Sequence, residues 1–293
     1  AEDKMKDLKE FILRFSSNAA KSKQATSRKK IYDKLAQSVE ELPVSTRKFP
    51  YVNFKADREI GNNVLEVKNI SYKDSDGVQL LKDFSLKVNR TDKIAFVGIE
   101  HNSISALFDI INEEKKPESG EYFWGQTTSH TYLPRDNSHF FENDYNITEW
   151  LKQYSKEQDD AYVRGFLGRM LFSGDESLKK VKVLSGGEKV RCMLSKLMLS
   201  GANVLIMDDP TNHLDLEAIQ SLNEALIAFP GVVLFTSHDN EFIQSVANRI
   251  VEITPNGIID RMTYFDDSIS DDSITELRKE MYKGTGKKLK FRI

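Results

Sequence analysis

The sequence predicts an α/β fold with a largely parallel sheet and a helical insertion, and three observations favour it. Lys93–Gly98 is a short, continuously apolar segment, which is typical of a strand buried on both faces of a parallel sheet. Residues 147–199 are mostly helical in pattern. The remaining apolar segments alternate with helical ones, and they begin at Val204, Val232, Ile250 and Ile258.

The composition of the chain limits the compartment and the class of protein to which it can belong. The chain has 293 residues, a formal net charge of −3 and a single cysteine, Cys192. We therefore expect no internal disulfide and a reducing compartment. No apolar run approaches the roughly 20 residues that span a bilayer, and no signal peptide opens the sequence. These observations predict a cytoplasmic protein with no membrane segment.

The first 50 residues form a distinct segment by composition. Apolar residues recur at helical spacing, with ten Lys or Arg against five Asp or Glu between Ala1 and Ala36. This pattern predicts a basic helical hairpin that acts as a linker, with a merely solvated hairpin as the alternative. We expect three parts: the linker at 1–50, a globular domain at 51–263 whose helical portion covers about 146–200, and a charged tail at 264–293.

The globular domain begins with two alternating segments. Leu65-Val67-Ile70 and Phe84-Leu86-Val88 place apolar residues at every second or third position, which predicts half-buried antiparallel strands. The buried strand at Lys93–Gly98 comes next, and Ile104–Ile111 follows it as a helix. This part therefore predicts an antiparallel β subdomain beside the parallel sheet.

A glycine-rich helix start follows the middle of the domain. Ser185-Gly186-Gly187-Glu188 has the capping-box form, a serine with a glutamate three residues on. The motif could simply begin a helix. However, the two glycines cost helix stability and would let an anion approach the free N–H groups of a helix N-terminus. The two glycines therefore favour the interpretation that this helix start is an anion site.

Two later predicted strands are followed by acidic or histidine side chains, which can act in catalysis or bind a metal. The apolar Val204–Met207 is followed by Asp208 and Asp209, and Val232–Phe235 is followed shortly by His238. Paired acids can be solvated charge, and a lone histidine at a strand end is often structural. The order of the three elements is more informative than any one of them.

That order resembles the nucleotide site of ABC-type (P-loop NTPase) ATPases, and Pro210–Asp215 resembles the ABC-F proteins, which act on ribosomes. The resemblance implies ATP and Mg²⁺ as cofactors, with Asp208 and Ser105 near the metal. It assigns Asp209 to the attacking water, with reduced competence because aspartate is shorter than the usual glutamate. His238 would sense the γ-phosphate. The signature residues Ser185, Gly186, Gly187 and Glu188 would face a γ-phosphate held by another domain.

The two remaining parts of the nucleotide site are an aromatic residue, Tyr72, and the phosphate loop. Tyr72 would stack on adenine by this resemblance, with an exposed or core tyrosine as the alternative. The loop departs from the family frame Gly-x-x-x-x-Gly-Lys-Ser/Thr, because only Gly98 and Ser105 match it and Ile104 replaces the lysine. A lysine about 4 Å from a phosphate contributes on the order of 4 kcal/mol at a dielectric near 20. Arg135 stands where a glutamine is usual and could restore positive charge. We therefore expect weak or absent nucleotide binding by this domain itself.

The resemblance covers almost the whole chain as the C-terminal half of an ABC-F protein. It implies a first ABC domain of the same protein, or a second copy, as partner, and the ribosome with its rRNA or tRNA as target. Lys21, Lys23, Arg28 and Lys29 are the expected RNA contacts. ATP hydrolysis would belong to the two-domain protein. The alternatives are the ATPase subunit of a membrane transporter and an interaction module that does not hydrolyse ATP.

Overall fold

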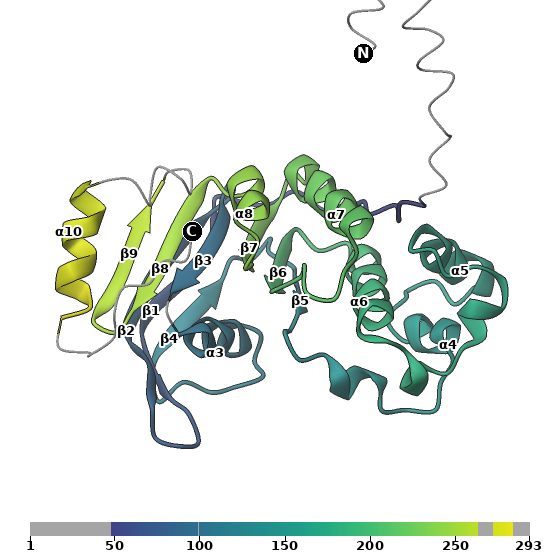
Figure 1. Cartoon of the computed structure of the whole chain (residues 1–293), viewed down its shortest axis with the longest axis horizontal. Coiled ribbons are helices and arrows are strands. Elements are labelled where there is room, and N and C mark those ends of the chain that lie inside the picture. The colour runs from purple at the N-terminus through teal and green to yellow at the C-terminus, as the bar shows by residue number, and fades with distance from the viewer. Residues whose placement is uncertain (1–47, 99, 263–271, 284–293) are drawn as a thin grey trace, which may run out of the picture. The chain divides into compact units, whose positions relative to one another are not determined.

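A computed structural model describes residues 48–98, 100–262 and 272–283 (Figure 1). The chain divides into two units, Ala1–Lys48 and Phe49–Ile293, and the description below concerns the second. The predicted RNA contacts Lys21, Lys23, Arg28 and Lys29, and most of the predicted charged tail, lie outside the described residues.

A six-stranded sheet forms the centre of the second unit, in the order β5-β6-β7-β3-β8-β9. Its first five strands pair in parallel, and β9 closes one edge as an antiparallel hairpin with β8. The strands are β3 (Lys93–Gly98), β5 (His130–Leu133), β6 (Val204–Asp208), β7 (Val232–Thr236), β8 (Arg249–Thr254) and β9 (Gly257–Arg261). The α/β prediction is confirmed, whereas β5 has a pattern that the sequence did not single out.

Both faces of this sheet are buried, which explains why β6 and β7 are continuously apolar. Side chains alternate along a strand, so successive residues enter different cores. In β6, Leu205 and Met207 belong to one hydrophobic cluster, while Val204 and Ile206 belong to the other. The parallel arrangement brings the carboxyl ends of β6 and β7 together at one edge.

The second sheet is antiparallel, with the order β2-β1-β4. It consists of β1 (Asn63–Lys73), β2 (Gln79–Asn89) and β4 (Ser119–Trp124). Its buried residues share one cluster with α3 (His101–Ile111) and with one face of the large sheet. Helix α3 therefore connects the two sheets.

The remaining helices cover the large sheet and form the insertion. Figure 1 shows α10 beyond the β9 edge and α4, α5 and α6 beyond the β5 side. They are α4 (Ile147–Lys152), α5 (Asp160–Arg169), α6 (Gly186–Ser200), α7 (Leu216–Ala228), α8 (Asn240–Val246) and α10 (Asp272–Met281), with 3-10 turns η1 (Ser138–Phe141), η2 (Gly174–Leu178) and η3 (Val181–Val183). None of the helices in the described ranges is long and apolar enough to cross a membrane.

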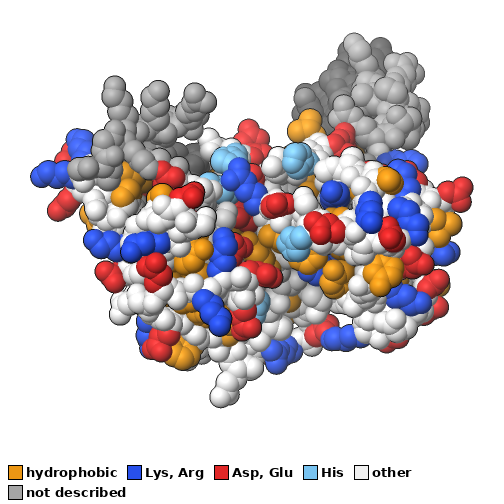
Figure 2. Space-filling model, turned by 90° about the horizontal axis from the view of Figure 1, so that it is seen from below, with side chains coloured by type: hydrophobic (Ala, Val, Ile, Leu, Met, Phe, Trp, Pro, Cys, Tyr) orange, Lys and Arg blue, Asp and Glu red, His pale blue; other side chains and the backbone are white. Residues whose placement is uncertain are grey.

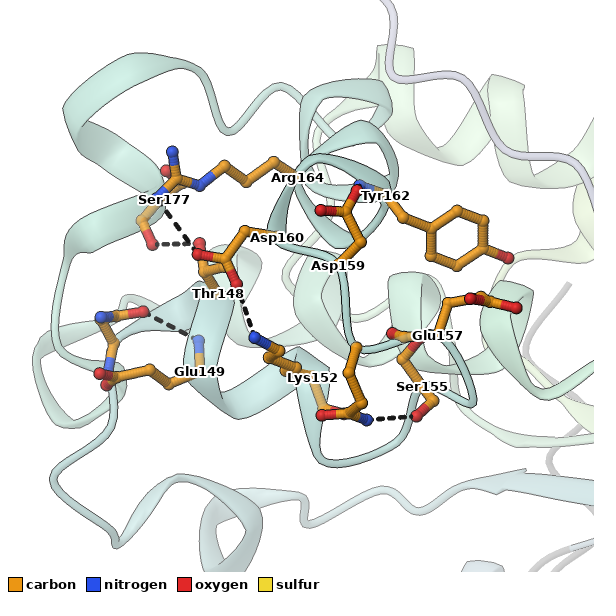
Figure 3. Close-up of polar contacts among 12 residues, drawn as sticks. Thr148, Glu149, Lys152, Ser155, Glu157, Asp159, Asp160, Tyr162, Arg164 and Ser177 are labelled. Carbon is orange, nitrogen blue, oxygen red and sulfur yellow. Dashed lines mark hydrogen bonds and ion pairs between the residues drawn. The ribbon is translucent and has the colours of Figure 1, made fainter.

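Polar contacts connect the helices of the insertion (Figure 3). The Lys152 ammonium donates to the Asp160 carboxylate at 2.7 Å, which links α4 to the first turn of α5. The Thr148 hydroxyl donates to the backbone carbonyl of Ser177 at 3.1 Å, which links α4 to η2. The buried side chains of α4, α5 and α6 belong to one hydrophobic cluster, so the insertion packs against α6, whose N-terminus carries the glycine-rich motif.

Candidate functional site

A cleft of about 560 Å³ opens where the carboxyl ends of β5 and β6 meet the first turns of α3 and α6. It brings together five of the residues that the sequence analysis selected. These are Ser105, Arg135, Gly186, Asp208 and Asp209. The face drawn in Figure 2 shows histidine side chains close to acidic and basic ones near the middle of the described surface.

Asp208 is buried at the floor of the cleft, where β6 ends. Both of its carboxylate oxygens are engaged by α3. The His101 Nε2 atom lies 2.8 Å from Oδ1, and the Ser105 hydroxyl donates to Oδ2 at 2.6 Å. Residues four apart on a helix share a face, so one face of the first turns of α3 holds Asp208 at two points.

Asp209 and His238 lie beside this group. Asp209 has a φ of 56°, an uncommon value for a residue other than glycine, and its side chain is buried. Its Oδ2 atom lies 3.7 Å from Nε2 of His238, whose side chain is 69% exposed. The rings of His101 and His238 stack with centroids 5.5 Å apart. The two strand ends and α3 are therefore in contact.

The N-terminus of α6 forms the opposite wall. The capping box is present, because the Ser185 side chain accepts from the Glu188 N–H while Glu188 accepts from the Ser185 N–H at 2.9 Å. Lys179 donates to the other Glu188 oxygen at 2.8 Å. Burial by itself raises the pKa of Glu188, but the hydrogen bonds from Lys179 and Ser185 outweigh it and lower that pKa to about 2.

Packing within the chain also explains why the two signature positions are glycine. A Cβ atom at Gly187 would lie 2.6 Å from the backbone oxygen of His213, and one at Gly186 would lie 3.1 Å from the His213 ring. His213 itself has a φ of 64°. Close packing against the turn after β6 therefore requires glycine at 187, independently of any ligand.

Two cationic side chains line the cleft. Within the part of the chain that the structure describes, Arg135 makes no hydrogen bond or ion pair, so its guanidinium is available to an anion. Lys189, from the first turns of α6, is the second. The sequence analysis did not select Lys189 or His213, which the fold brings to the cleft lining, or His101, which the fold places against Asp208.

Other selected residues lie outside the cleft lining. A Cβ atom at Gly98 would lie 2.6 Å from the backbone oxygen of Ile253, so glycine lets β3 approach β8 closely. Tyr72 packs against the hydrophobic cluster around α3, with the Lys115 ammonium 5.9 Å from its ring centroid. Its assignment to adenine stacking stays a prediction.

Comparison with known proteins agrees with this geometry. Two family models match, both described as "ABC transporter", one over residues 81–212 and the other over residues 1–54. The chain contains an ABC ATPase domain. Among solved structures, it resembles a putative metal-chelate type ABC transporter with a TM-score of 0.59 and 18% identity, covering 75% of this chain and 89% of that one. At this identity the likeness shows the fold.

Curated relatives include ABC-F proteins. The chain is 54% identical to the uncharacterized ABC transporter ATP-binding protein YkpA of Bacillus subtilis, over 96% of this chain and 52% of the relative. It is 31% identical to the energy-dependent translational throttle protein EttA of Haemophilus influenzae, over 72% and 38%. It is 31% identical to protein GCN20 of Saccharomyces cerevisiae, over 84% and 32%. The chain spans about half the length, or less, of these relatives.

ABC ATPase domains bind ATP with Mg²⁺. The end of the cleft at Asp208 and the end at α6 differ in how well they fit the metal and the phosphates. Asp208 and Ser105 offer the oxygen ligands that Mg²⁺ prefers. However, both Asp208 oxygens are already engaged, and Ile104, in the lysine position, is buried in the core with 2% exposure. As arranged, these residues do not fit a Mg²⁺-bound triphosphate. The glycine-lined start of α6 fits an anion.

Proposed function

We propose that this chain supplies the signature side of an ATP site whose phosphate loop belongs to another ABC domain. The observation that carries the proposal is the contrast between two helix starts at one cleft. Helix α6 begins with a capping serine and two glycines, the first of which lines the cleft, whereas α3 has no lysine there and directs Ile104 into the core. A free helix N-terminus attracts a phosphate through its N–H groups and its dipole.

In this arrangement Ser185, Gly186 and Gly187 contact the γ-phosphate held by the partner domain. Arg135 and Lys189 add positive charge along the cleft. Asp208, Asp209 and His238 keep the places of metal ligand, water-orienting acid and phosphate sensor. ATP hydrolysis is then a property of the paired domains, and is weak or absent in this chain alone.

The pairing partner is the first ABC domain of the same protein or a second copy of this chain. The translational name of the Haemophilus influenzae relative supports action on the ribosome. Within that function the basic residues Lys21, Lys23, Arg28 and Lys29 contact rRNA or tRNA, and the protein works in the cytoplasm.

One matched pair of variants at Gly186 tests the signature contact. Gly186→Asp and Gly186→Asn add nearly the same volume next to the His213 ring, but only aspartate adds a negative charge. An acidic residue in the first turn favours the helix, so the aspartate variant should fold at least as well as the asparagine variant. Repulsion of the γ-phosphate should nevertheless lower the rate of Mg-ATP hydrolysis.

The measurement is steady-state ATP turnover by a protein that contains both ABC domains. We expect the Asp variant to turn over at least 10-fold more slowly than the Asn variant. Equal rates for the two variants would contradict the proposal. Cosedimentation of the protein with ribosomes rather than with membranes separates it from a transporter subunit.

A second candidate function is an interaction module that does not hydrolyse ATP. The engagement of both Asp208 oxygens favours it, because His101 and Ser105 compete with a metal ion for those oxygens. The capped, glycine-containing start of α6 favours the first candidate, and ATP turnover separates the two. An interaction module predicts no turnover by the two-domain protein, with or without the Gly186 variants.

A further inference from the structure

His101 contacts Asp208 at the end of β6, and neither the family frame nor the sequence analysis gives it a role. It sits in the segment where the frame expects a loop around phosphates. In this chain α3 begins at His101, directly after Glu100, so the segment is already helical. The helical start sends Ser103 and Ile104 into the interior and turns His101 and Ser105 toward β6.

The contacts of His101 connect three elements. Its Nε2 atom lies 2.8 Å from the Asp208 carboxylate at the end of β6. Its ring stacks on His238, which follows β7, with an angle of 27° between the ring planes. Its side chain is only 16% exposed. The imidazole is thus fixed between strand ends rather than extended into solvent.

Asp208 has little capacity left for a metal-bound nucleotide. The carboxylate is fully buried, one oxygen accepts from Ser105 and the other contacts His101. A Mg²⁺ ion or its water would have to compete with the imidazole for the lone pairs of Oδ1. Across the described part of the chain, no group of three or more His, Cys, Asp or Glu side chains could hold a metal ion.

We propose that His101 is a positioning residue that keeps the domain's own phosphate site closed. It holds Asp208 in the conformation that a nucleotide-bound metal would otherwise impose, and it fixes His238 beside Asp209. The β6 and β7 ends therefore remain ordered without a nucleotide bound at this domain's own phosphate site. This inference rests on the proposed function, since it explains how one half-site can stay closed while the signature half works.

Two substitutions of His101 test the closure. His101→Ala removes the contact with Oδ1, whereas His101→Gln keeps an N–H donor of similar reach. Asn102→Ala is the matched control, because Asn102 lies in the same turn but does not hold the Asp208 carboxylate. The probes are Mn²⁺ alone, followed by electron paramagnetic resonance, and Mg-ATP, followed by calorimetry, each with the full 293-residue chain.

We expect His101→Ala to bind Mn²⁺ and Mg-ATP at least 10-fold more tightly than the wild type, and His101→Gln and Asn102→Ala to remain close to it. Thermal unfolding of each variant checks that the fold is kept. Unchanged or weaker binding by a folded His101→Ala would overturn the proposal. So would equal gains in the Ala and Gln variants, because the contact with Asp208 would then not matter.

The two proposals fail separately. The turnover ratio of the Gly186 pair concerns the signature side, and the His101 series concerns the domain's own phosphate side. Equal rates at Gly186 with tighter binding by His101→Ala would refute the proposed function and leave the closure intact. The opposite result would refute the closure alone.

Discussion

Helices α3 and α6 begin at the same cleft, yet their first turns are built differently. At α6 the Ser185 side chain caps the helix, and the two glycines of the first turn pack closely against His213. At α3 the capping residue Glu100 makes no side-chain cap, and His101 in the first turn contacts Asp208. The first turn of α6 lines the cleft with Gly186, whereas the first turns of α3 hold the Asp208 carboxylate with the His101 and Ser105 side chains.

The largest expected effect is at α3. Ile104→Lys restores the family's phosphate-loop residue, but the side chain points into the core cluster. A charge buried without a partner is costly, and we expect a loss of about 3–5 kcal/mol in the free energy of unfolding, with no gain in Mg-ATP affinity. Urea unfolding and calorimetry measure the two quantities.

Ile104→Met is the control for that substitution, because it keeps the volume and adds no charge. It should cost less than about 1.5 kcal/mol. A stable Ile104→Lys protein that binds Mg-ATP would show that α3 can rearrange into a phosphate loop, and the contrast between the helices would then be wrong.

A smaller effect is expected at α6. Gly187→Ala brings a Cβ atom against the His213 backbone oxygen, which cannot move aside as a side chain can. We expect it to destabilise the fold by about 1–3 kcal/mol. Gly186→Ala meets only the His213 ring and should cost less. Chemical unfolding of the two variants measures the free energies to be compared. An unchanged free energy of unfolding in Gly187→Ala would mean that the turn after β6 is not fixed by this helix.

The smallest effect concerns the capping box. Glu188→Gln removes the charge that accepts from Lys179 and Ser185, and we expect a loss of about 0.5–1 kcal/mol at pH 7. The pKa of Glu188 is lowered from 4.5 to about 2 in the fold. Its contribution is therefore fully present above pH 4.5 and disappears as the pH falls toward 2.

The stability difference between wild type and Glu188→Gln should shrink over that pH range, as measured by denaturant unfolding at each pH. A difference that stays constant below pH 4.5 would show that the carboxylate charge does not support the start of α6.

The sequence predicts the parts of this site that depend on local patterns. The capping box at Ser185, the buried strands and the acids at the end of β6 follow from spacing and periodicity. The contacts of His101 with Asp208 and of Gly187 with His213 join residues far apart in the chain, so no local pattern contains them. The helical start at His101 was also missed, because the family frame predicts a loop there.

The contrast between α3 and α6 makes a direct prediction about stoichiometry. A protein that contains this domain and its partner ABC domain should bind one Mg-ATP per pair of domains under conditions that slow hydrolysis, as counted by equilibrium dialysis with labelled ATP. The nucleotide should lie in the partner's phosphate loop against α6. Two tightly bound nucleotides per pair would contradict the account.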